Sequence, residues 1–322
     1  MKKIFLVALA LNFVACSTDN NETSSDQLSL VKESTFNPNP TPEDYRIAKY
    51  PSFIENQKSL SEKGSVIGKT AAVWVNTLVP NLAFRNRLIS LGAGQEDANL
   101  TDNYINIDKT RGGLDLNNAG ISDLTGIQAF TSLSQLVVSN NTLTTLNISA
   151  LTNLTWLECQ NNQISVLNVS ANTNLYQVWC QNNGLTSLTL PANTTTLWGV
   201  WCYGNNLTTL NLNGNNKITD LFCQTNQLTT LGTTPLTELK QTNLSYNKWT
   251  TLNFTTNSKL TFIYITNCTL LTDINLKNGN NPAITGQSFQ SNSKSPAIHV
   301  DATFLSSANT SWPNKGTSTY VL

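Results

Sequence analysis

The chain has 322 residues, of which 12% are charged, and its 19 basic residues balance its 19 acidic ones. This balance argues against a nucleic-acid partner, because proteins that bind nucleic acids present a basic surface to the phosphates. The single histidine leaves few means of acid–base catalysis or of metal binding through imidazole groups. The composition therefore argues against an enzyme, and we predict no catalytic residue, no metal site and no cofactor.

The first fifteen residues, 1–15, have the pattern of a signal peptide. Two lysines precede an apolar run over residues 4–14, which is too short for the roughly twenty residues that cross a bilayer. The residues FVAC at 13–16 resemble the lipobox of bacterial lipoproteins, although Phe13 stands where leucine is usual. The resemblance implies cleavage before Cys16 and a membrane anchor through lipid on its sulfur and amine. An ordinary signal peptide that is cleaved nearby is the alternative.

Residues 16–44 are rich in Ser, Thr, Asn and Pro and poor in aromatic side chains. A segment of this composition cannot bury enough apolar surface to fold by itself. We therefore expect a disordered tether between the anchor and the rest of the chain.

A repeat of 21 or 22 residues begins at Leu133. The leading residues of its units are Leu133, Leu154, Leu175, Leu197, Ile218, Leu239 and Leu260. Each unit follows L-x-x-L-x-L-x-x-N/C-x-L, the signature of leucine-rich repeats, and a weaker unit precedes them at Leu114 and Leu116. The sequence therefore predicts a leucine-rich-repeat solenoid of eight units over residues 114–283. Its parallel β-sheet is expected on the concave side, with mostly turns on the convex side.

The alternation of side chains within a unit predicts which of them are buried. Positions four and six carry apolar residues and share one face of a short strand, so this face should form the core. Position nine carries asparagines whose amides can pair with backbone groups where the chain leaves the strand. They are Asn141, Asn162, Asn183, Asn205, Asn226 and Asn247. Asn257 lies outside this position, and we expect it to contribute little to stability.

Position six is a cysteine in four successive units, which we call the cysteine ladder: Cys159, Cys180, Cys202 and Cys223. Neighbouring parallel strands lie about 4.8 Å apart, whereas a disulfide prefers Cβ atoms about 3.8 Å apart. This mismatch favours buried thiols that act as small apolar side chains over a disulfide. Zinc is also disfavoured, because four thiols along a line do not converge on a tetrahedron.

The repeats resemble those of internalin-like proteins, in particular the cysteine-ladder repeats of lipoproteins from Bacteroidota. The resemblance extends to residues 79–92, similar to the N-terminal cap of that family, and to residues 297–322, similar to its closing segment. It implies an N-terminal cap region over residues 45–113 and a C-terminal cap over residues 284–322. Together with the lipobox, it implies a lipoprotein of the outer membrane that is exposed at the cell surface.

Positions three, five and seven point away from the predicted core and form the candidate ligand-binding surface. The aromatic side chains at these positions are Trp156, Trp179, Trp201, Tyr203, Phe222, Phe262 and Tyr264. We expect them to form an exposed stripe rimmed by amides, which is typical of an interaction surface. The ligand would be a protein, for which aromatic anchors are common, or a neutral glycan.

Three alternatives to this dedicated binding surface remain. The rings could serve solely to reinforce the sheet by stacking on one another, without binding a ligand. The chain could be a structural envelope protein without a dedicated ligand, or an accessory glycan-binding protein for polysaccharide uptake.

Overall fold

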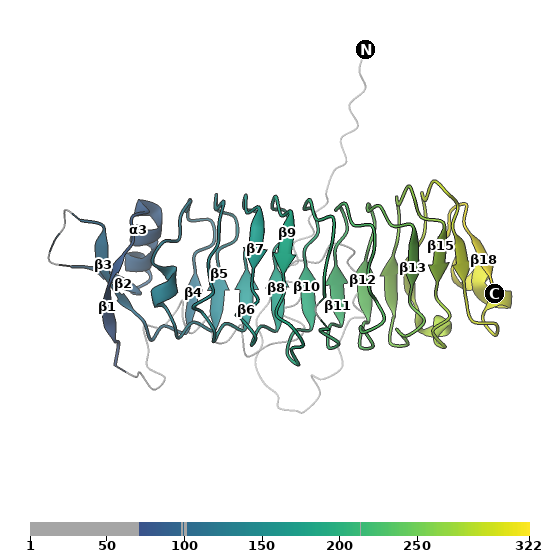
Figure 1. Ribbon diagram of the computed structural model, residues 1–322, viewed down its shortest axis with the longest axis horizontal. Coiled ribbons are helices and arrows are strands. Elements are labelled where there is room, and N and C mark those ends of the chain that lie inside the picture. The colour runs from purple at the N-terminus through teal and green to yellow at the C-terminus, as the bar shows by residue number, and fades with distance from the viewer. Residues whose placement is uncertain (1–70, 98, 100–101, 213) are drawn as a thin grey trace, which may run out of the picture. The chain divides into compact units, whose positions relative to one another are not determined.

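The computed structural model describes residues 71–97, 99, 102–212 and 214–322 (Figure 1). The expected signal peptide, the expected lipidation site Cys16, the expected tether and residues 45–70 of the expected cap region therefore lie outside the described residues. Among the described residues, no helix combines the length and the apolar character that crossing a membrane requires.

A small antiparallel sheet and one helix precede the repeats. The elements are β1 (Trp74–Leu78), α3 (Leu82–Ser90), β2 (Gly94–Glu96) and β3 (Tyr104–Asp108), and β3 pairs with both other strands. The Asn81 side chain caps α3 by accepting a hydrogen bond from the backbone N–H of Phe84. The buried side chains of α3, Phe84 and Leu88, belong to the same apolar cluster as the repeats, so the helix shares their core.

Nine three-residue strands form one parallel sheet and lie side by side in Figure 1. They are β4 (Gly113–Asp115), β5 (Gln135–Val137), β6 (Trp156–Glu158), β8 (Gln177–Trp179), β10 (Gly199–Trp201), β11 (Asp220–Phe222), β12 (Gln241–Asn243), β14 (Phe262–Tyr264) and β16 (Gly286–Ser288). Each pair is in register at equivalent positions, as where Val178 pairs with Val200. The predicted leucine-rich-repeat solenoid is confirmed.

The opposite side of the solenoid consists of turns and a few short strands. Two small parallel sheets lie there, β7 (Val166–Asn168) with β9 (Ser187–Thr189), and β13 (Thr251–Asn253), β15 (Asp273–Asn275), β17 (Ala297–His299) and β18 (Thr319–Val321) in that order. The described helices beyond α3 are η1 (Ile127–Ala129), η2 (Asn281–Ala283) and α4 (Leu305–Ser311). The prediction of little helix on this side is confirmed.

The core lies between these two sides. Side chains at positions four and six, such as Val178, Cys180 and Val200, are fully buried in one apolar cluster. Trp249 fills the half of its unit that lies away from the nine-stranded sheet, and its Nε1 donates a hydrogen bond to the Leu244 carbonyl at 2.7 Å. Positions four and six therefore contribute successive layers of side chains to a continuous core, and these are apolar except for Thr242 and Gln287 at position four.

The sheet continues further along the chain than the sequence indicated. Strand β16 pairs with β14 and lies within residues 284–322, which were expected to form the C-terminal cap. Asn292 then takes the position-nine role, because its Nδ2 donates to the carbonyls of Ile265 and Phe289, both at 2.8 Å. The expected boundary at residue 283 is therefore one strand too early. The sequence pattern did not reveal this ninth unit for two reasons. Its position four is a polar residue, Gln287, and Gln287 follows its register partner Ile263 by 24 residues, whereas the repeat is 21 or 22 residues long.

Candidate functional site

The position-nine asparagines join successive units by hydrogen bonds. The Nδ2 of Asn183 donates to the carbonyls of Cys159 and Cys180 at 3.0 and 3.1 Å, and its Oδ1 accepts from the Ile164 N–H at 3.0 Å. Asn162, Asn205, Asn226 and Asn247 donate in the same way to the carbonyls of the position-six residues of their own and the preceding unit. Asn141 does so at the first of these units, with the carbonyls of Leu116 and Val138. These side chains therefore link the backbone of each unit to that of the unit before it.

A second set of asparagines, which the sequence reasoning missed, lies on the other side of the core. Asn172, Asn215 and Asn257 are fully buried. The Nδ2 of Asn257 donates to the Thr233 and Leu236 carbonyls at 3.2 and 2.7 Å. The expectation that Asn257 contributes little is therefore wrong, because its amide satisfies two backbone carbonyls inside the solenoid. Their recurrence at intervals of 43 and 42 residues was the signal that could have revealed them.

The four cysteines of the ladder are buried and free, as is Cys268, and none of these five forms a disulfide. Burial raises the pKa of the Cys202 thiol to about 12, and the pKa values of the other three ladder thiols also rise, chiefly because burial disfavours the thiolate. Within the described part of the chain, His, Cys, Asp and Glu side chains nowhere gather in a group able to hold a metal ion. The ladder thiols are therefore poor nucleophiles and poor metal ligands.

The aromatic residues of adjacent strands form a cluster separate from the core. Trp179, Trp201 and Phe222 make up this aromatic stack, with Trp198 and Tyr203 packed against it. The rings of Trp179 and Trp201 lie 3.7 Å apart and are parallel within 2°. Phe222 follows at 6.1 Å from Trp201, and Trp198 meets Trp201 edge-on at 5.7 Å. These rings therefore project from the side of the sheet opposite the core, which we call the outer face.

The expectation that the rings of the stack are exposed is wrong. Trp179, Trp201 and Phe222 are fully buried, and Trp156 is 4% exposed. Parallel rings on neighbouring strands cover one another's faces. Gly199 allows the ring of Trp201 to lie back over its own strand, where a Cβ would overlap that ring. The stack is therefore a packed layer on the outer face and not an open stripe.

The more accessible aromatic residues of the outer face are Tyr203, Phe262 and Tyr264, each of which is half-buried. The last two lie on β14, and the ring of Phe262 lies over Gly286 of the adjacent strand. The seven aromatic residues thus divide into a buried group and a partly open group.

Buried polar side chains surround the stack. Glu158 and Asp220 are 2% and 1% exposed, and Glu158 accepts a hydrogen bond from the Nε1 of Trp156 at 2.8 Å. Gln177 is fully buried, and neither its Nε2 nor its Oε1 has a hydrogen-bond partner. The Oε1 atoms of Gln160 and Gln181 also have none. Because such groups are costly in a core, they mark the outer face as more than structural filling.

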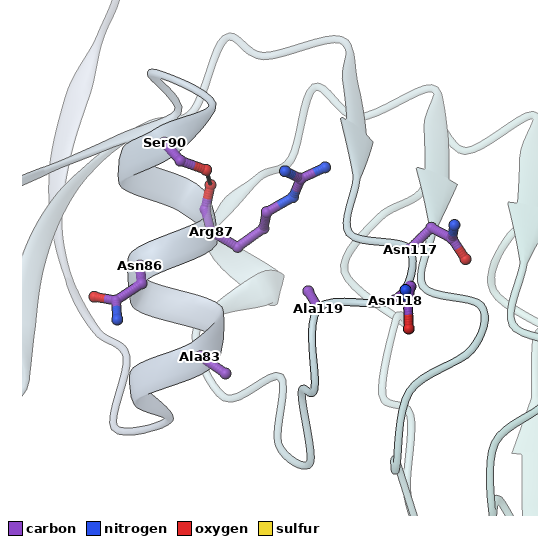
Figure 2. A pocket seen from close by; sticks show the side chains of 7 residues that line it. All are labelled: Ala83, Asn86, Arg87, Ser90, Asn117, Asn118 and Ala119. Atoms are coloured by element: carbon purple, nitrogen blue, oxygen red, sulfur yellow. Dashed lines mark hydrogen bonds between the residues drawn. The ribbon is translucent and has the colours of Figure 1, made fainter.

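A hollow of about 460 Å³ opens where α3 meets the first unit (Figure 2). It is lined by Ala83, Asn86, Arg87, Ser90, Asn117, Asn118 and Ala119. The Arg87 guanidinium spans it, with Nε and Nη2 donating to the Asp115 carbonyl at 3.2 and 3.1 Å. Arg87 thereby satisfies a carbonyl on the end strand β4 of the sheet. The lining has no carboxylate, histidine or cysteine, so this hollow lacks the groups of a general acid or a nucleophile.

No protein-family model matches the sequence, and no curated protein is detectably similar to it. Two solved internalins of Listeria monocytogenes have this fold. One, inlF, is 17% identical over 69% of this chain and 71% of its own, with a TM-score of 0.52. The other, internalin C2, is 18% identical over 68% of this chain and 97% of its own, with a TM-score of 0.51. These likenesses show a leucine-rich-repeat fold of the internalin type.

The functional domain of InlJ from the same organism, which includes a cysteine ladder, is also similar. It is 23% identical over 70% of this chain, with a TM-score of 0.36. This chain spans 63% of the length of that structure.

Proposed function

We propose that this chain is a lipid-anchored recognition protein of the bacterial cell envelope, which binds a partner protein through the outer face of its nine-stranded sheet. The observation that carries the proposal is the aromatic cluster outside the core, with Gln177 beside it. Apolar residues at positions four and six fill the core of the solenoid, and the three large rings lie on the other side of the strands in a cluster of their own. Large aromatic residues at the centre of a polar surface are typical of protein interfaces.

The geometry of the rings favours a protein over a neutral glycan. Trp179 and Trp201 are parallel at 3.7 Å, so their broad faces are occupied by one another. A sugar stacks on the broad face of an aromatic ring, and the central pair does not offer its shared faces for this. The half-buried Tyr203, Phe262 and Tyr264 supply anchors that a complementary protein surface can enclose.

The role we propose is binding and not catalysis. The ladder thiols are held in their protonated form by burial. Both ring nitrogens of the single histidine, His299, lie 2.8 Å from an oxygen, one of Asp273 and the other of the Leu322 backbone. These contacts engage the imidazole within the fold, which agrees with the sparse acid–base equipment of the sequence.

The proposed location rests on the lipobox resemblance at residues 13–16 and on the resemblance to lipoproteins of Bacteroidota. Lipid on Cys16 would hold the chain at the outer membrane, with the repeats displayed at the cell surface. Intact-mass measurement of the native protein should show acyl chains on the amino-terminal cysteine. A Cys16→Ala variant that remains in the detergent phase, together with a native mass free of lipid, would refute the anchor.

The proposed binding face is tested with an array of purified extracellular proteins and neutral glycans. The probe is the full chain with Cys16→Ser, which removes the lipid site. We expect binding to a protein, weakened by about 2 kcal/mol or more in the best of the Tyr203→Ala, Phe262→Ala and Tyr264→Ala variants. Tyr104→Ala is the matched control, since Tyr104 is 42% exposed on β3, outside the nine-stranded sheet.

Equal binding by all four variants would show that the partner meets another surface. An array with no protein bound would favour a structural envelope role, whereas binding confined to glycans would favour polysaccharide uptake.

A further inference from the structure

The antiparallel sheet that precedes the repeats, formed by β1, β3 and β2, has one face covered by α3. Ile105 and Ile107 of β3 point to this face and are fully buried. Gly94 of β2 is the register partner of Ile107, and a Cβ built on Gly94 would lie 3.1 Å from the Cβ of Leu88 of α3. Alternate side chains of each strand point to the opposite face, which we call the open face.

The open face carries large apolar side chains. Trp74 and Leu78 of β1 are each 40% exposed, and Tyr104 of β3 is 42% exposed. Leu78 and Tyr104 are register partners, so their side chains lie next to each other across the two strands. The residue between Trp74 and Leu78 on this face is Asn76, whose register partner is Asn106. We call Trp74, Leu78 and Tyr104 the cap patch.

Exposed apolar side chains are concentrated around this patch. Ten large apolar side chains are exposed among the described residues, and five of these fall within residues 73–104. Val73 and Leu82 are the two that lie beside the cap patch in the sequence. The other five are scattered from Val166 to the end of the chain. Single exposed apolar residues are normal in a folded protein, whereas a cluster of them marks an interaction surface.

The chemistry of the cap patch suits the surface of a lipid bilayer. Tryptophan and tyrosine combine an apolar ring with one polar group, and such side chains are enriched where lipid headgroups meet acyl chains. Asp108 is the charged residue among the strand residues that point to the open face, and none of these residues is basic. The face therefore offers apolar contact and no attraction to anionic lipid.

The place of the cap patch in the chain also favours a bilayer. Residues 17–73 connect the expected lipidation site, Cys16, to β1, which lies at one end of the row of strands in Figure 1. Lipid on Cys16 would keep this end of the solenoid near the membrane at a high effective concentration. A patch of a few side chains is then sufficient to hold the sheet against the bilayer, because a second weak signal adds to the first.

We propose, on the basis of the anchored role proposed above, that the open face of the β1–β3–β2 sheet rests on a phospholipid bilayer. Trp74, Leu78 and Tyr104 enter the boundary between headgroups and acyl chains, and the chain lies on the membrane there without crossing it. The nine strands of the repeats follow one another away from this end of the molecule (Figure 1). The outer face of the nine-stranded sheet is thereby left accessible to a partner.

The test attaches the chain to vesicles by a route that does not require the native lipid. The chain from residue 16 onward is coupled through the Cys16 thiol to a maleimide-bearing lipid in phosphatidylcholine vesicles. The five cysteines of the repeats are buried and should not react. Bromine atoms on the acyl chains quench the fluorescence of a tryptophan that enters the bilayer, and Trp74 is the exposed one of the seven tryptophans. We expect brominated lipid to lower the fluorescence of the unaltered chain but not that of Trp74→Phe.

Paired variants assign the contact to the cap patch. Leu78→Gln combined with Tyr104→Gln should abolish the quenching, although Trp74 is still present. Leu270→Gln combined with Tyr246→Gln is the matched control, since it removes one exposed leucine and one exposed tyrosine from the repeats. This control should be quenched as strongly as the unaltered chain. Anionic phosphatidylglycerol in the vesicles should not increase the quenching, and circular dichroism reports whether each variant is folded.

No quenching of the unaltered chain, or equal quenching of the unaltered chain and Trp74→Phe, would overturn this inference. A dimer that forms without quenching and is lost in the Leu78→Gln and Tyr104→Gln variant would assign the cap patch to a second copy of the chain. If the native protein carries no lipid but the coupled chain is quenched, the anchor is wrong and the affinity of the patch for a bilayer stands. If the native protein is lipidated but the coupled chain is not quenched, the anchor stands and the membrane contact of the cap patch is wrong.

Discussion

The two faces of the nine-stranded sheet follow different rules. On the core face, position six reads Cys159, Cys180, Cys202 and Cys223 in successive units, because every layer must fill the same space. On the outer face, position five reads Glu158, Trp179, Trp201 and Phe222, with no such repetition. The repeating face specifies the fold, whereas the non-repeating face is free to vary with what it contacts. Variants on each face should therefore separate stability from recognition.

The largest effect is expected from the cysteine ladder at alkaline pH. The pKa of Cys202 is about 12 in the folded chain against an ordinary value of 9.0, because burial disfavours the thiolate. A raised folded-state pKa means that the stabilisation is complete below pH 9 and is lost as the pH rises towards 12. Between pH 9 and 11, Cys202 alone should lower the free energy of unfolding by about 2 kcal/mol, and the other ladder thiols act in the same direction.

Urea unfolding in the presence of a reductant measures this pH dependence. Cys202→Val is the matched variant, since valine already occupies position six at Val138. Between pH 9 and 11, the variant should lose less stability than the unaltered chain, and the difference should equal the contribution of the Cys202 thiol. An unchanged pH dependence would mean that Cys202 ionises as readily in the folded chain as in the unfolded one.

The next largest effect concerns the two sets of asparagines. Asn183→Ala and Asn257→Ala should each lower the free energy of unfolding by about 1 to 3 kcal/mol, because each leaves buried backbone carbonyls without a donor. Asn216→Ala, at an exposed position, is the control. A loss at Asn183 with none at Asn257 would restrict the structural role to position nine.

The core face was largely predictable from the sequence, because burial imposes a spacing. Residues such as Leu157, Val178 and Cys180 recur at positions four and six, and this recurrence gave the strands, their register and the buried thiols. Asn257 was misjudged because its equivalents recur in only some of the units: the corresponding residue is Leu151 in one unit and Leu236 in another. A search for a single period does not detect such a pattern.

For the outer face, the sequence predicted which way the side chains point but not how they pack. Alternation placed Trp179, Trp201 and Phe222 away from the core, which the separate cluster shows. The orientation of the Trp201 ring depends on Gly199, whose missing side chain gives that ring its place. Such side-chain packing between neighbouring strands has no signature in the repeat.

Gly199→Ala tests this arrangement of the outer face. The added Cβ would overlap the Trp201 ring, so the ring must move and its stacking on Trp179 must change. We expect a loss of about 1 to 3 kcal/mol in unfolding free energy and a change in the near-ultraviolet circular dichroism of the tryptophans. Gly232→Ala is the matched control, because a Cβ there meets nothing within 4 Å. An unaltered tryptophan spectrum in Gly199→Ala would show that the ring does not depend on the glycine.

The smallest effect is expected at Thr242, which with Gln287 is one of two polar residues at position four of the core face. Thr242 is fully buried, and its hydroxyl donates to the Leu221 carbonyl at 2.8 Å. Thr242→Val gives up this hydrogen bond, worth about 0.5 to 1.5 kcal/mol, but replaces a hydroxyl with a methyl group that gains about 0.8 kcal/mol on burial. The two terms nearly cancel, so the free energy of unfolding should change by less than about 1 kcal/mol. Val178 and Val200, at the same position in other units, show that the layer accommodates valine.

Urea unfolding of Thr242→Val beside Thr242→Ala, which leaves a cavity, separates the effect of side-chain volume from that of the hydrogen bond. A loss for Thr242→Val as large as that for Thr242→Ala would mean that the hydroxyl, and not the volume of the side chain, is what the core face requires at this strand.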